Sequence, residues 1–410
     1  MIKKTPKRVV ITGLGIITSI GETMPSFENA LFDGKCGIDQ VSIFDTQGFP
    51  TQTAGQVKNN DLKAHFQPRD IKRASRCDLL GLIAAEEAFS NAGNLLERYQ
   101  PDEIGVVLGG GAGGMLSWEN YRRTAWEGNK NPEASPVLAA SPGTLTDLIG
   151  NRYGLSGIRS TVTTACSSSA TAIGYGFDLI RSKTQKIVIS GGSESLSELT
   201  FAGFNSLKVT DPYFCRPFDK NRQGISLGEG ASILVLEDYH HARDRGAKIW
   251  GEVMGYAINS DAFHLTSPDP SARGVSRVMI TALENSSVQP SQVDYINAHG
   301  TATKINDKME TKAIKNVFGE DKAGSLAISS TKSMVGHCLG ASGAIEAAAT
   351  ILALQNQMVP PTIHYETSDP ECDLDYVPNH SRAMEIRISL SNSFAFGGNN
   401  TSIVFGRAPN

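Results

Sequence analysis

Four segments of the 410-residue chain carry residues that could do chemistry, and the sharpest contains a cysteine. In STVTTACSSSATAIGYGFDLIRS (160–182), a β-branched run leads into Cys166 and small residues follow. This pattern predicts a thiol at a strand-to-helix turn, close to a helix N-terminus. The partial positive charge there favours thiolate, so we expect a lowered pKa and a nucleophilic role. The alternative is an ordinary buried core cysteine.

The second segment, VDYINAHGTATKINDKMET (293–311), places a histidine where a hydrophobic run ends. His299 follows this predicted strand, and the carboxyl edge of strands is where α/β sheets bind ligands. Thr301 and Thr303 add hydroxyls that could hydrogen-bond a polar chain such as pantetheine. A single histidine is more often structural, so this segment alone leaves both interpretations open.

The third segment, SSTKSMVGHCLGASGAIEAAATILAL (329–354), sets Lys332, His337 and Glu346 around the start of an Ala-rich helix. Its small residues imply tight burial, in which the lysine and the glutamate would neutralise each other or orient His337. The fourth, SNSFAFGGNNTSIVFG (391–406), is a strand interrupted by Phe-Ala-Phe-Gly-Gly, which predicts a mobile or sharply bent loop. One cysteine, two histidines and this loop form a constellation unlike a metal site.

Composition excludes several other classes of function. The net charge is −4, which gives no electrostatic case for nucleic acid. No apolar run approaches the roughly 20 residues that cross a bilayer. The basic start MIKKTPKRVVITGLG lacks the features of a secretory signal, so we expect a cytoplasmic protein. The six cysteines include no CxxC pair and no zinc-like spacing, so we expect no metal.

Two glycine-rich segments fail the tests for nucleotide binding. GLGIIT (13–18) has Thr18 where a dinucleotide fingerprint needs its third glycine, and GGGAGG (109–114) lacks the ending of a P-loop. These glycines are better explained by tight turns or by close approach of the backbone to a ligand or subunit. A nucleotide-dependent oxidoreductase is therefore not favoured.

Short β-branched runs alternate with helix-like stretches along the whole chain, which predicts an α/β fold. The predicted helices include 73–93 and 340–357, and the predicted strands are 8–16, 104–111, 160–165, 186–192, 231–238, 293–300, 325–333, 386–394 and 401–406. Each half contains strand, glycine-rich turn and small-residue helix in similar succession, so two pseudo-twofold related halves are a fair hypothesis. The boundary is expected near 255, giving halves 1–255 and 256–410.

With TACSSS, NAHGT, KSMVGH and SFAFGGNN in this order, the chain resembles the β-ketoacyl-[acyl-carrier-protein] synthases of the type II elongating kind over essentially its whole length. The resemblance implies the thiolase fold, a five-layered αβαβα core whose N-terminal half carries the nucleophile and whose C-terminal half carries two histidines. It also implies a dimeric acyltransferase that catalyses decarboxylative condensation. Substrates would arrive on the 4'-phosphopantetheine of acyl carrier protein, with no bound cofactor.

The resemblance also implies roles for individual residues. Cys166 would accept the acyl chain, while His299 and His337 would hold the malonyl thioester carbonyl and assist loss of carbon dioxide. Backbone N–H groups of Cys166 and Phe396 would form an oxyanion hole. Supporting residues would be Lys332 and Glu346 near His337, with Asp307 and Glu310 as structural acids behind the His299 loop.

Departures from the family pattern bear on the acyl pocket. Ala395 stands where glycine is common and could stiffen the loop that carries Phe394, a residue of the acyl pocket and gate, and Asn399-Asn400 replaces the usual Thr-Asn. Ala112 stands where a bulky aliphatic residue often closes the pocket floor near the dimer interface. The smaller side chain implies a longer pocket that accepts long or rigid chains.

The resemblance leaves the pathway open. TSDPECDLDYVP (367–378) and 296–311 are similar to the ketosynthase-α subunit of type II polyketide synthases, whereas TACSSS is similar to the fatty-acid enzymes. We slightly favour polyketide or polyene synthesis over housekeeping fatty-acid elongation, as a homodimer or as a heterodimer with a chain-length-factor-like subunit. A non-catalytic chain-length factor would typically lack Cys166. A degradative thiolase would need a second catalytic cysteine, which neither Cys338 nor Cys372 obviously supplies.

One basic segment could bind the acidic carrier protein. PRDIKRASR (68–76) places Arg69, Lys72, Arg73 and Arg76 at helical spacings, which predicts a positive stripe on an otherwise acidic protein. The alternative is an ordinary solvated helix face.

Overall fold

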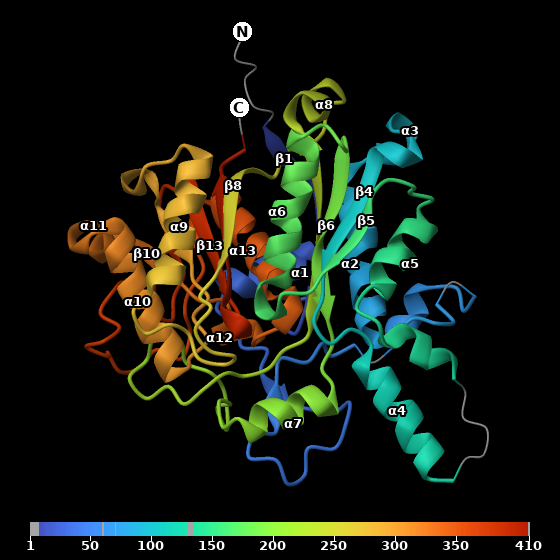
Figure 1. Cartoon of the computed structure of the whole chain (residues 1–410), viewed down its shortest axis with the longest axis horizontal. Coiled ribbons are helices and arrows are strands. Elements are labelled where there is room, and N and C mark those ends of the chain that lie inside the picture. The colour runs from blue at the N-terminus through green and yellow to red at the C-terminus, as the bar shows by residue number, and fades with distance from the viewer. Residues whose placement is uncertain (1–7, 60, 70, 129–133, 409–410) are drawn as a thin grey trace.

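In the computed structural model, which describes residues 8–59, 61–69, 71–128 and 134–408, a mixed sheet runs through the molecule (Figure 1). Its ten strands, in spatial order, are β10 (Ala327–Ser329), β9 (Tyr295–Asn297), β13 (Ile388–Phe394), β14 (Asn399–Gly406), β8 (Gly251–Ser260), β1 (Val9–Thr18), β7 (Gly230–Asp238), β6 (Ile187–Glu194), β4 (Ile104–Gly109) and β5 (Arg159–Val162).

The strand order repeats in the two halves of this sheet. β5-β4-β6-β7-β1 matches β10-β9-β13-β14-β8 strand for strand. The directions match as well: the outer three strands of each half are parallel, and the next two pairings are antiparallel. The halves join where Val9–Ile11 of β1 pairs with Gly251–Val253 of β8. The chain therefore consists of two topologically equivalent five-stranded units.

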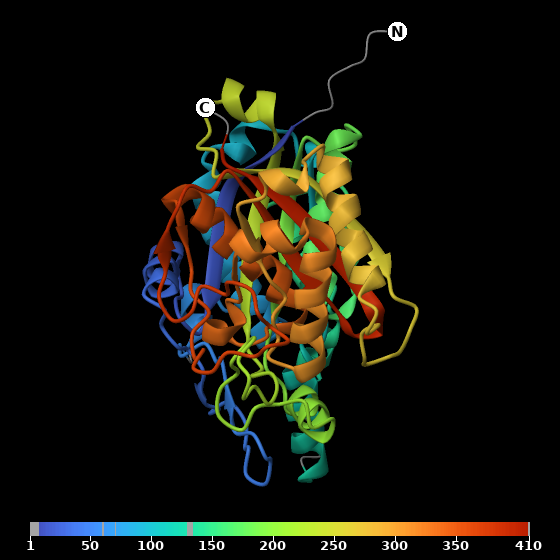
Figure 2. The ribbon, with the colours of Figure 1, turned by 90° about the vertical axis from the view of Figure 1, so that its left-hand side faces the viewer.

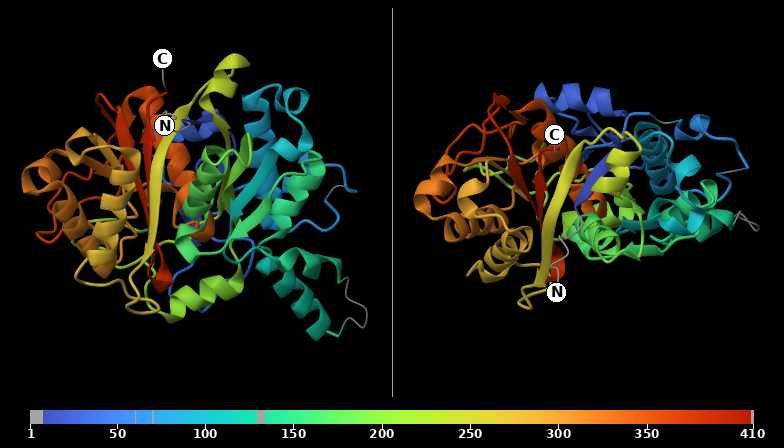
Figure 3. Two further views of the ribbon diagram at one scale, coloured as in Figure 1. Left: turned by 45° about the horizontal axis from the view of Figure 1, so that its top comes forward. Right: turned by 90° about the horizontal axis from the view of Figure 1, so that it is seen from above.

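Helices cover both outer faces and fill the space between the two units. On the outside, α2 (Arg76–Ala92) and α5 (Thr144–Arg152) cover the N-terminal strands. On the opposite side, which faces the viewer in Figure 2, α9 (Arg273–Ser286) and α10 (Lys304–Phe318) cover the C-terminal strands. Between the units, α6 (Ser168–Arg181) packs against α13 (Ser342–Asn356), as the views in Figure 3 allow the reader to follow. The predicted five-layered αβαβα thiolase fold is confirmed.

Small residues explain the close packing of these layers. A Cβ at Gly343 of α13 would lie 2.7 Å from the backbone nitrogen of Ala170 in α6, so the two central helices pack backbone against backbone. In β1, a Cβ at Gly15 would lie 2.0 Å from the carbonyl oxygen of Ala84 in α2. The glycines of GLGIIT therefore serve helix–strand packing, in line with the expectation that they do not bind a nucleotide.

The remaining elements are short and lie around this core. The helices are α1 (Met24–Phe32), α3 (Leu95–Arg98), α4 (Met115–Trp126), α7 (Glu198–Ser206), α8 (Tyr239–Asp244), α11 (Glu320–Ser325) and α12 (Lys332–Val335). The 3-10 turns are η1 (Leu62–His65), η2 (Pro101–Glu103), η3 (Ser135–Ala140), η4 (Ala165–Ser167), η5 (Pro290–Gln292), η6 (Leu339–Ala341) and η7 (Phe396–Gly398). Two small ribbons pair β2 (Asp39–Gln40) with β3 (Thr53–Ala54) and β11 (Met358–Val359) with β12 (Arg382–Ala383).

Two sequence expectations about boundaries need comment. The helix predicted to begin at residue 73 begins at Arg76, because Ser75 caps it by accepting a hydrogen bond from the Asp78 N–H. Residues 71–75 are not helical, so the predicted helical stripe of basic residues is wrong. The division at 255 falls inside β8 and stays a prediction. Within the described ranges, no helix is long and apolar enough to cross a membrane.

Candidate active site

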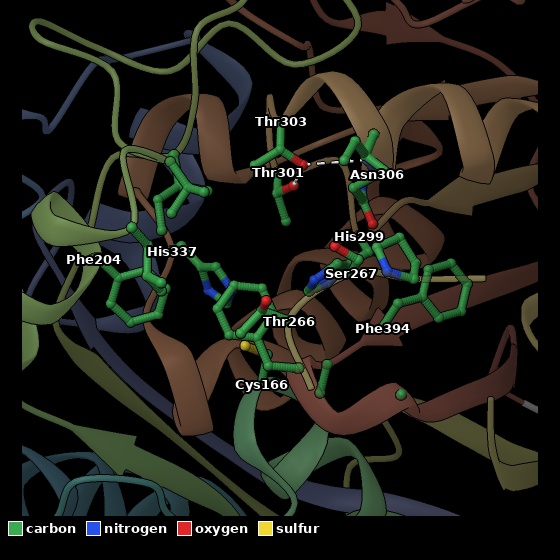
Figure 4. A pocket seen from close by; sticks show the side chains of 18 of the residues that line it. Cys166, Phe204, Thr266, Ser267, His299, Thr301, Thr303, Asn306, His337 and Phe394 are labelled. Carbon is green, nitrogen blue, oxygen red and sulfur yellow. Dashed lines mark hydrogen bonds between the residues drawn. The ribbon is translucent and has the colours of Figure 1, made fainter. Parts of the chain in front are cut away.

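The cysteine and both histidines singled out in the sequence line one cavity of about 390 Å³ (Figure 4). Cys166 comes from the N-terminal unit, whereas His299 and His337 come from the C-terminal unit. Burial is nearly complete, with 6%, 2% and 3% of these three residues exposed. The two imidazole rings lie 5.4 Å apart, centre to centre, and almost perpendicular at 86°. The fold thus assembles at one place residues that are far apart in the chain.

Cys166 lies in η4, between β5 and the start of α6. The preceding residue, Ala165, has a left-handed backbone with φ of 51°. The N–H of Phe396, from η7, donates a hydrogen bond to the sulfur. Burial raises the pKa of Cys166 to about 11, while the Lys332 charge and the Phe396 N–H lower it. The lowered pKa expected from the helix N-terminus is therefore wrong, because desolvation is the larger effect.

His299 lies two residues after the end of β9, and Lys332 and Glu310 fix its ring and its backbone. Its Nδ1 lies 3.2 Å from Lys332 Nζ. An ammonium group has only donors, so Nδ1 accepts and the neutral ring carries its proton on Nε2. Glu310 of α10 fixes the backbone here, accepting hydrogen bonds from the N–H groups of His299 at 2.9 Å and Gly300 at 2.8 Å. The ring therefore offers Nε2–H as its free donor.

His337 lies between α12 and η6, and its tautomer is set by a backbone group. The N–H of Leu339 donates to His337 Nδ1 at 3.2 Å, and Ser342 Oγ lies 2.9 Å from the same nitrogen. Since Nδ1 accepts, the proton of the neutral ring resides on Nε2. Both histidines thus have Nε2–H donors that remain available in the cavity.

Neither histidine carries a positive charge near neutral pH. Burial lowers the pKa of His299 well below its ordinary value of 6.5, and the charge of Lys332 lowers it further. The pKa of His337 falls for the same two reasons. The cavity therefore presents two neutral N–H donors, which can stabilise a negative oxygen without carrying a full charge themselves.

Lys332 of α12 and Glu346 of α13 form a buried ion pair, each with 2% of its side chain exposed. Burial raises the pKa of Glu346 to about 7, whereas the charge and hydrogen bond of Lys332 lower it. The expectation that this pair orients His337 is wrong: the lysine contacts His299. Proximity in the sequence suggested His337, but the hydrogen bond of Lys332 Nζ is made with His299 Nδ1.

The remaining predicted residues divide between cavity lining and backbone support. Thr301, Thr303 and Phe394 line the cavity, and the two threonine hydroxyls lie 3.0 Å apart. The Phe396 ring stacks on Phe204 with centroids 5.8 Å apart. Ala112 lies in the loop after β4 and is not among the described residues that line this cavity.

Asp307 of α10 also supports the loop after β9. It accepts hydrogen bonds from the Phe218 N–H at 2.7 Å and the Ala302 N–H at 3.1 Å. Arg222 lies 3.8 Å from it and is nearly fully buried. Together with Glu310, this acid holds backbone groups behind His299.

The three basic residues predicted to bind a carrier protein do not share a surface environment. Lys72 and Arg73 are exposed. Arg76 instead has only 13% of its side chain exposed and pairs with the fully buried Glu229 at 2.6 Å. The docking role predicted for Arg76 is therefore wrong, because its guanidinium is committed to an internal carboxylate.

Several cavity residues were not predicted. The segment 266–268 lines the cavity together with Phe204 and Asn400. Asn400 Nδ2 donates to Asp261 Oδ1 at 2.7 Å, which connects the start of β14 to the segment after β8. Asn399-Asn400 had been noted only as a departure from the family, and its partner Asp261 is distant in sequence. Among the described residues, no group of three or more His, Cys, Asp or Glu side chains could hold a metal ion.

Comparison with known proteins agrees with this geometry. The beta-ketoacyl synthase N-terminal domain model matches residues 6–242, and the corresponding C-terminal domain model matches residues 250–366. A 3-oxoacyl-[acyl-carrier-protein] synthase 2 from Synechocystis sp. is 41% identical, over 97% of this chain and 98% of its own.

Two solved structures are similar over nearly the whole chain. The ishigamide ketosynthase/chain length factor has a TM-score of 0.93 at 35% identity, covering 99% of this chain and 100% of that one. A type II polyketide synthase acyl-carrier protein in complex with its ketosynthase, bound to the hexaketide, contains a chain with a TM-score of 0.90 at 32% identity, covering 98% and 100%.

The chain belongs to the β-ketoacyl synthase family. It is a ketosynthase, an acyltransferase that joins acyl units in fatty-acid or polyketide synthesis. The predicted class of enzyme is confirmed.

Proposed function

We propose that Cys166 is the nucleophile that holds the growing acyl chain. Its thiol attacks the carbonyl carbon of an acyl thioester on phosphopantetheine, and the carbon–sulfur bond of that thioester breaks. The proton of the Cys166 thiol leaves on the pantetheine sulfur, so the exchange is proton-neutral. This matters because burial raises the pKa of Cys166 to about 11, and the resting group at neutral pH is the thiol.

The two histidines then serve the malonyl unit. Their Nε2–H donors hold the thioester carbonyl oxygen while the bond to the terminal carboxylate breaks and carbon dioxide leaves. The electron pair of that bond becomes an enolate, stabilised by the same two donors. Its carbon attacks the acyl group on Cys166, and the new carbonyl forms as the cysteine thiolate leaves and takes up a proton from water to restore the thiol. The Phe396 N–H, which lies against the sulfur, supplies an oxyanion donor together with the N–H of Cys166.

The observation that carries this proposal is one cavity containing the thiol and both rings. Cys166→Ala should abolish acylation, seen by intact mass spectrometry after incubation with acyl carrier protein. Some carbon dioxide release from malonyl carrier should remain, because both histidines are intact. Cys36→Ala is the matched control, since that cysteine is exposed and should leave acylation unchanged. Acylation that persists in Cys166→Ala would overturn the proposal.

For the pathway, we favour polyketide or polyene synthesis, with fatty-acid elongation by a homodimer as the alternative. The similarity to a ketosynthase/chain length factor structure supports this choice. Tagged protein purified from its native cells should bring down a homologous subunit that lacks the cysteine. Recovery of the homodimer alone, with products limited to saturated chains, would favour fatty-acid elongation instead.

Ala112 is proposed to allow a long acyl pocket, with Phe394 at its gate. Ala112→Ile should then abolish acylation by long chains while acylation by short chains continues. The short-chain substrate serves as the internal control for folding. Equal loss of both activities would remove Ala112 from the pocket.

Lys72 and Arg73 are proposed to bind the acidic carrier protein, with Thr301 and Thr303 holding its pantetheine arm. Charge reversal at Lys72 and Arg73 should raise KM for carrier substrates about 10-fold at low salt, with little change in kcat. The difference should shrink as salt increases. Arg277→Glu on the distant helix α9 is the matched control. An unchanged KM would exclude this surface.

A further inference from the structure

Glu194 ends strand β6 and is fully buried, with 0% of its surface exposed. Four backbone N–H groups donate to its carboxylate. Three belong to the loop after β4: Gly111 at 2.9 Å, Ala112 at 2.9 Å and Gly113 at 3.2 Å. The fourth is Gly340 of η6, at 3.1 Å, which belongs to the C-terminal unit. One side chain therefore joins the two halves of the fold beside the cavity.

The bond to Gly340 fixes the turn that sets the tautomer of His337. Leu339, the residue before Gly340, donates its N–H to His337 Nδ1. Leu339 has a left-handed backbone with φ of 44°, a conformation that is unfavourable for a residue other than glycine. Such a conformation persists only when its surroundings hold it. The bond from the next N–H to Glu194 is one such constraint.

The backbone around the Glu194 carboxylate is tightly packed. A Cβ at Gly340 would lie 2.6 Å from the Gly111 nitrogen and 2.8 Å from Glu194 Oε2. A Cβ at Gly111 would also lie 2.8 Å from that oxygen. Burial raises the pKa of Glu194 to about 7, although its N–H donors lower it. Burying a carboxylate is unfavourable for folding, so a buried carboxylate that contacts both units indicates a function at this position.

We propose that Glu194 is a positioning residue for decarboxylation: it anchors η6 so that the Leu339 N–H faces His337 Nδ1 and the Nε2–H of His337 faces the substrate. This inference deepens the proposed function and rests on it. Glu194 does not touch the reacting atoms. Its effect should fall on the malonyl step, which uses His337, and not on acylation of Cys166.

The first variant is Glu194→Gln. The amide keeps one acceptor oxygen, so its NH₂ group would face either the Ala112 and Gly113 N–H groups or the Gly111 and Gly340 N–H groups, and that pair of donors would lose its acceptor. Carbon dioxide release from malonyl carrier should fall about 10- to 100-fold, the range seen when a residue that orients an active-site histidine through a second group is lost. The rate of Cys166 acylation should stay within about 3-fold, since that step does not use His337.

Gly340→Ala is a second variant that displaces the same turn and keeps the carboxylate. It should give the same split between the two half-reactions, and it decides the matter if Glu194→Gln does not fold. Glu237→Gln is the matched control, because Glu237 is another fully buried carboxylate, bonded to Tyr99 and Arg245 away from the cavity. It should lower stability without separating the half-reactions.

A spectroscopic readout keeps this proposal distinct from the catalytic roles. In protein labelled with ¹⁵N-histidine, the His337 signals should report the Nε2–H tautomer in the wild type and a shift toward Nδ1–H in both variants. The chain has eight histidines, so His337→Gln assigns the signals. An unchanged tautomer together with equal loss of both half-reactions would overturn the proposal. If Cys166 proved not to be the nucleophile, the tautomer measurement would still decide the role of Glu194.

Discussion

The two halves of the sheet build the same turn and use it for different chemistry. In the N-terminal unit, β5 leads to left-handed Ala165 (φ 51°), the turn η4 and helix α6. In the C-terminal unit, β10 leads through α12 to left-handed Leu339 (φ 44°), the turn η6 and helix α13. Cys166, the proposed nucleophile, comes one residue after the left-handed position, whereas His337 comes two residues before it. Equivalent backbone frames therefore present a thiol in one unit and an imidazole in the other.

β6 and β13 are equivalent strands of the two units, and the end of each contacts a turn in the other unit: β6 contacts η6, and β13 contacts η4. β6 ends at Glu194, which accepts the Gly340 N–H. β13 leads to Phe396, whose N–H donates to Cys166. One contact supplies an acceptor that holds backbone, and the other supplies a donor where negative charge would develop. The repeated fold thus makes two equivalent contacts between the units: at one, the Glu194 carboxylate accepts a hydrogen bond, and at the other, the Phe396 N–H donates one.

The variant with the largest expected effect removes the buried Lys332–Glu346 ion pair of the C-terminal unit. Lys332→Met deletes the α12 cation that bonds His299 and leaves Glu346 buried without its partner. Breaking a buried pair in this way should cost about 3–5 kcal/mol of unfolding free energy. Decarboxylation should fall about 100-fold, because His299 loses the donor that fixes its tautomer. Chemical denaturation and carbon dioxide release measure the two effects.

A double variant separates stability from catalysis at this pair. Lys332→Met with Glu346→Leu removes both buried charges, so it should regain most of the lost stability. It should not regain decarboxylation, since His299 Nδ1 still lacks its donor. Recovery of activity in the double variant would show that α12 contributes packing only, and the contrast between the two units would lose its chemical basis.

Much of the frame was predictable from local sequence patterns. The runs that became β1, β6 and β7 are apolar and β-branched, and the small residues of α6 and α13 indicated central burial. The four motifs also predicted which residues would meet, because each follows or interrupts a strand. These features depend on neighbours close in the chain.

What could not be predicted depends on partners far along the chain. Arg76 belongs to a basic segment, but its partner Glu229 lies 153 residues away. Lys332 makes its hydrogen bond with His299, which lies 33 residues away, and not with the nearby His337. The direction of the Cys166 pKa shift depends on desolvation by both units together. Glu194 carried no motif, although a charged residue ending an apolar strand was a usable signal.

Of the two contacts between the units, only the one made by the Glu194 carboxylate contains a titratable group, so only this contact should make stability depend on pH. Burial raises the pKa of Glu194 from the ordinary 4.5 to about 7. Between these two values the folded state binds more protons than the unfolded state, so this group lowers the free energy of unfolding as pH rises. Glu194→Gln removes that contribution, whereas the Phe396 N–H has none to remove.

Denaturation curves at pH 5, 6, 7 and 8 measure this effect. Relative to the wild type, the variant should gain stability as pH rises from 5 to 7, by on the order of 2 kcal/mol. Glu310 and Glu346, whose pKa values also rise to about 7, are present in both proteins and cancel in the difference. Parallel pH profiles would show that Glu194 does not titrate in this range, and the proposed asymmetry would lose this support.

The smallest effect concerns the left-handed residue that the two turns share. Ala165→Gly removes the steric cost of φ 51°, which is about 1–2 kcal/mol, and adds about 0.5–1 kcal/mol of unfolded-state entropy. The variant should therefore be more stable by up to about 1 kcal/mol. Leu339→Gly relieves similar strain, but Leu339 also packs against a buried cluster that contains Phe201 and Leu227. Losing that contact costs about 2 kcal/mol or more, so this variant should be less stable. Opposite signs in denaturation would show that the packing of the Leu339 side chain outweighs the relief of strain, whereas stabilisation by both variants would show that this packing contributes less than the strain costs.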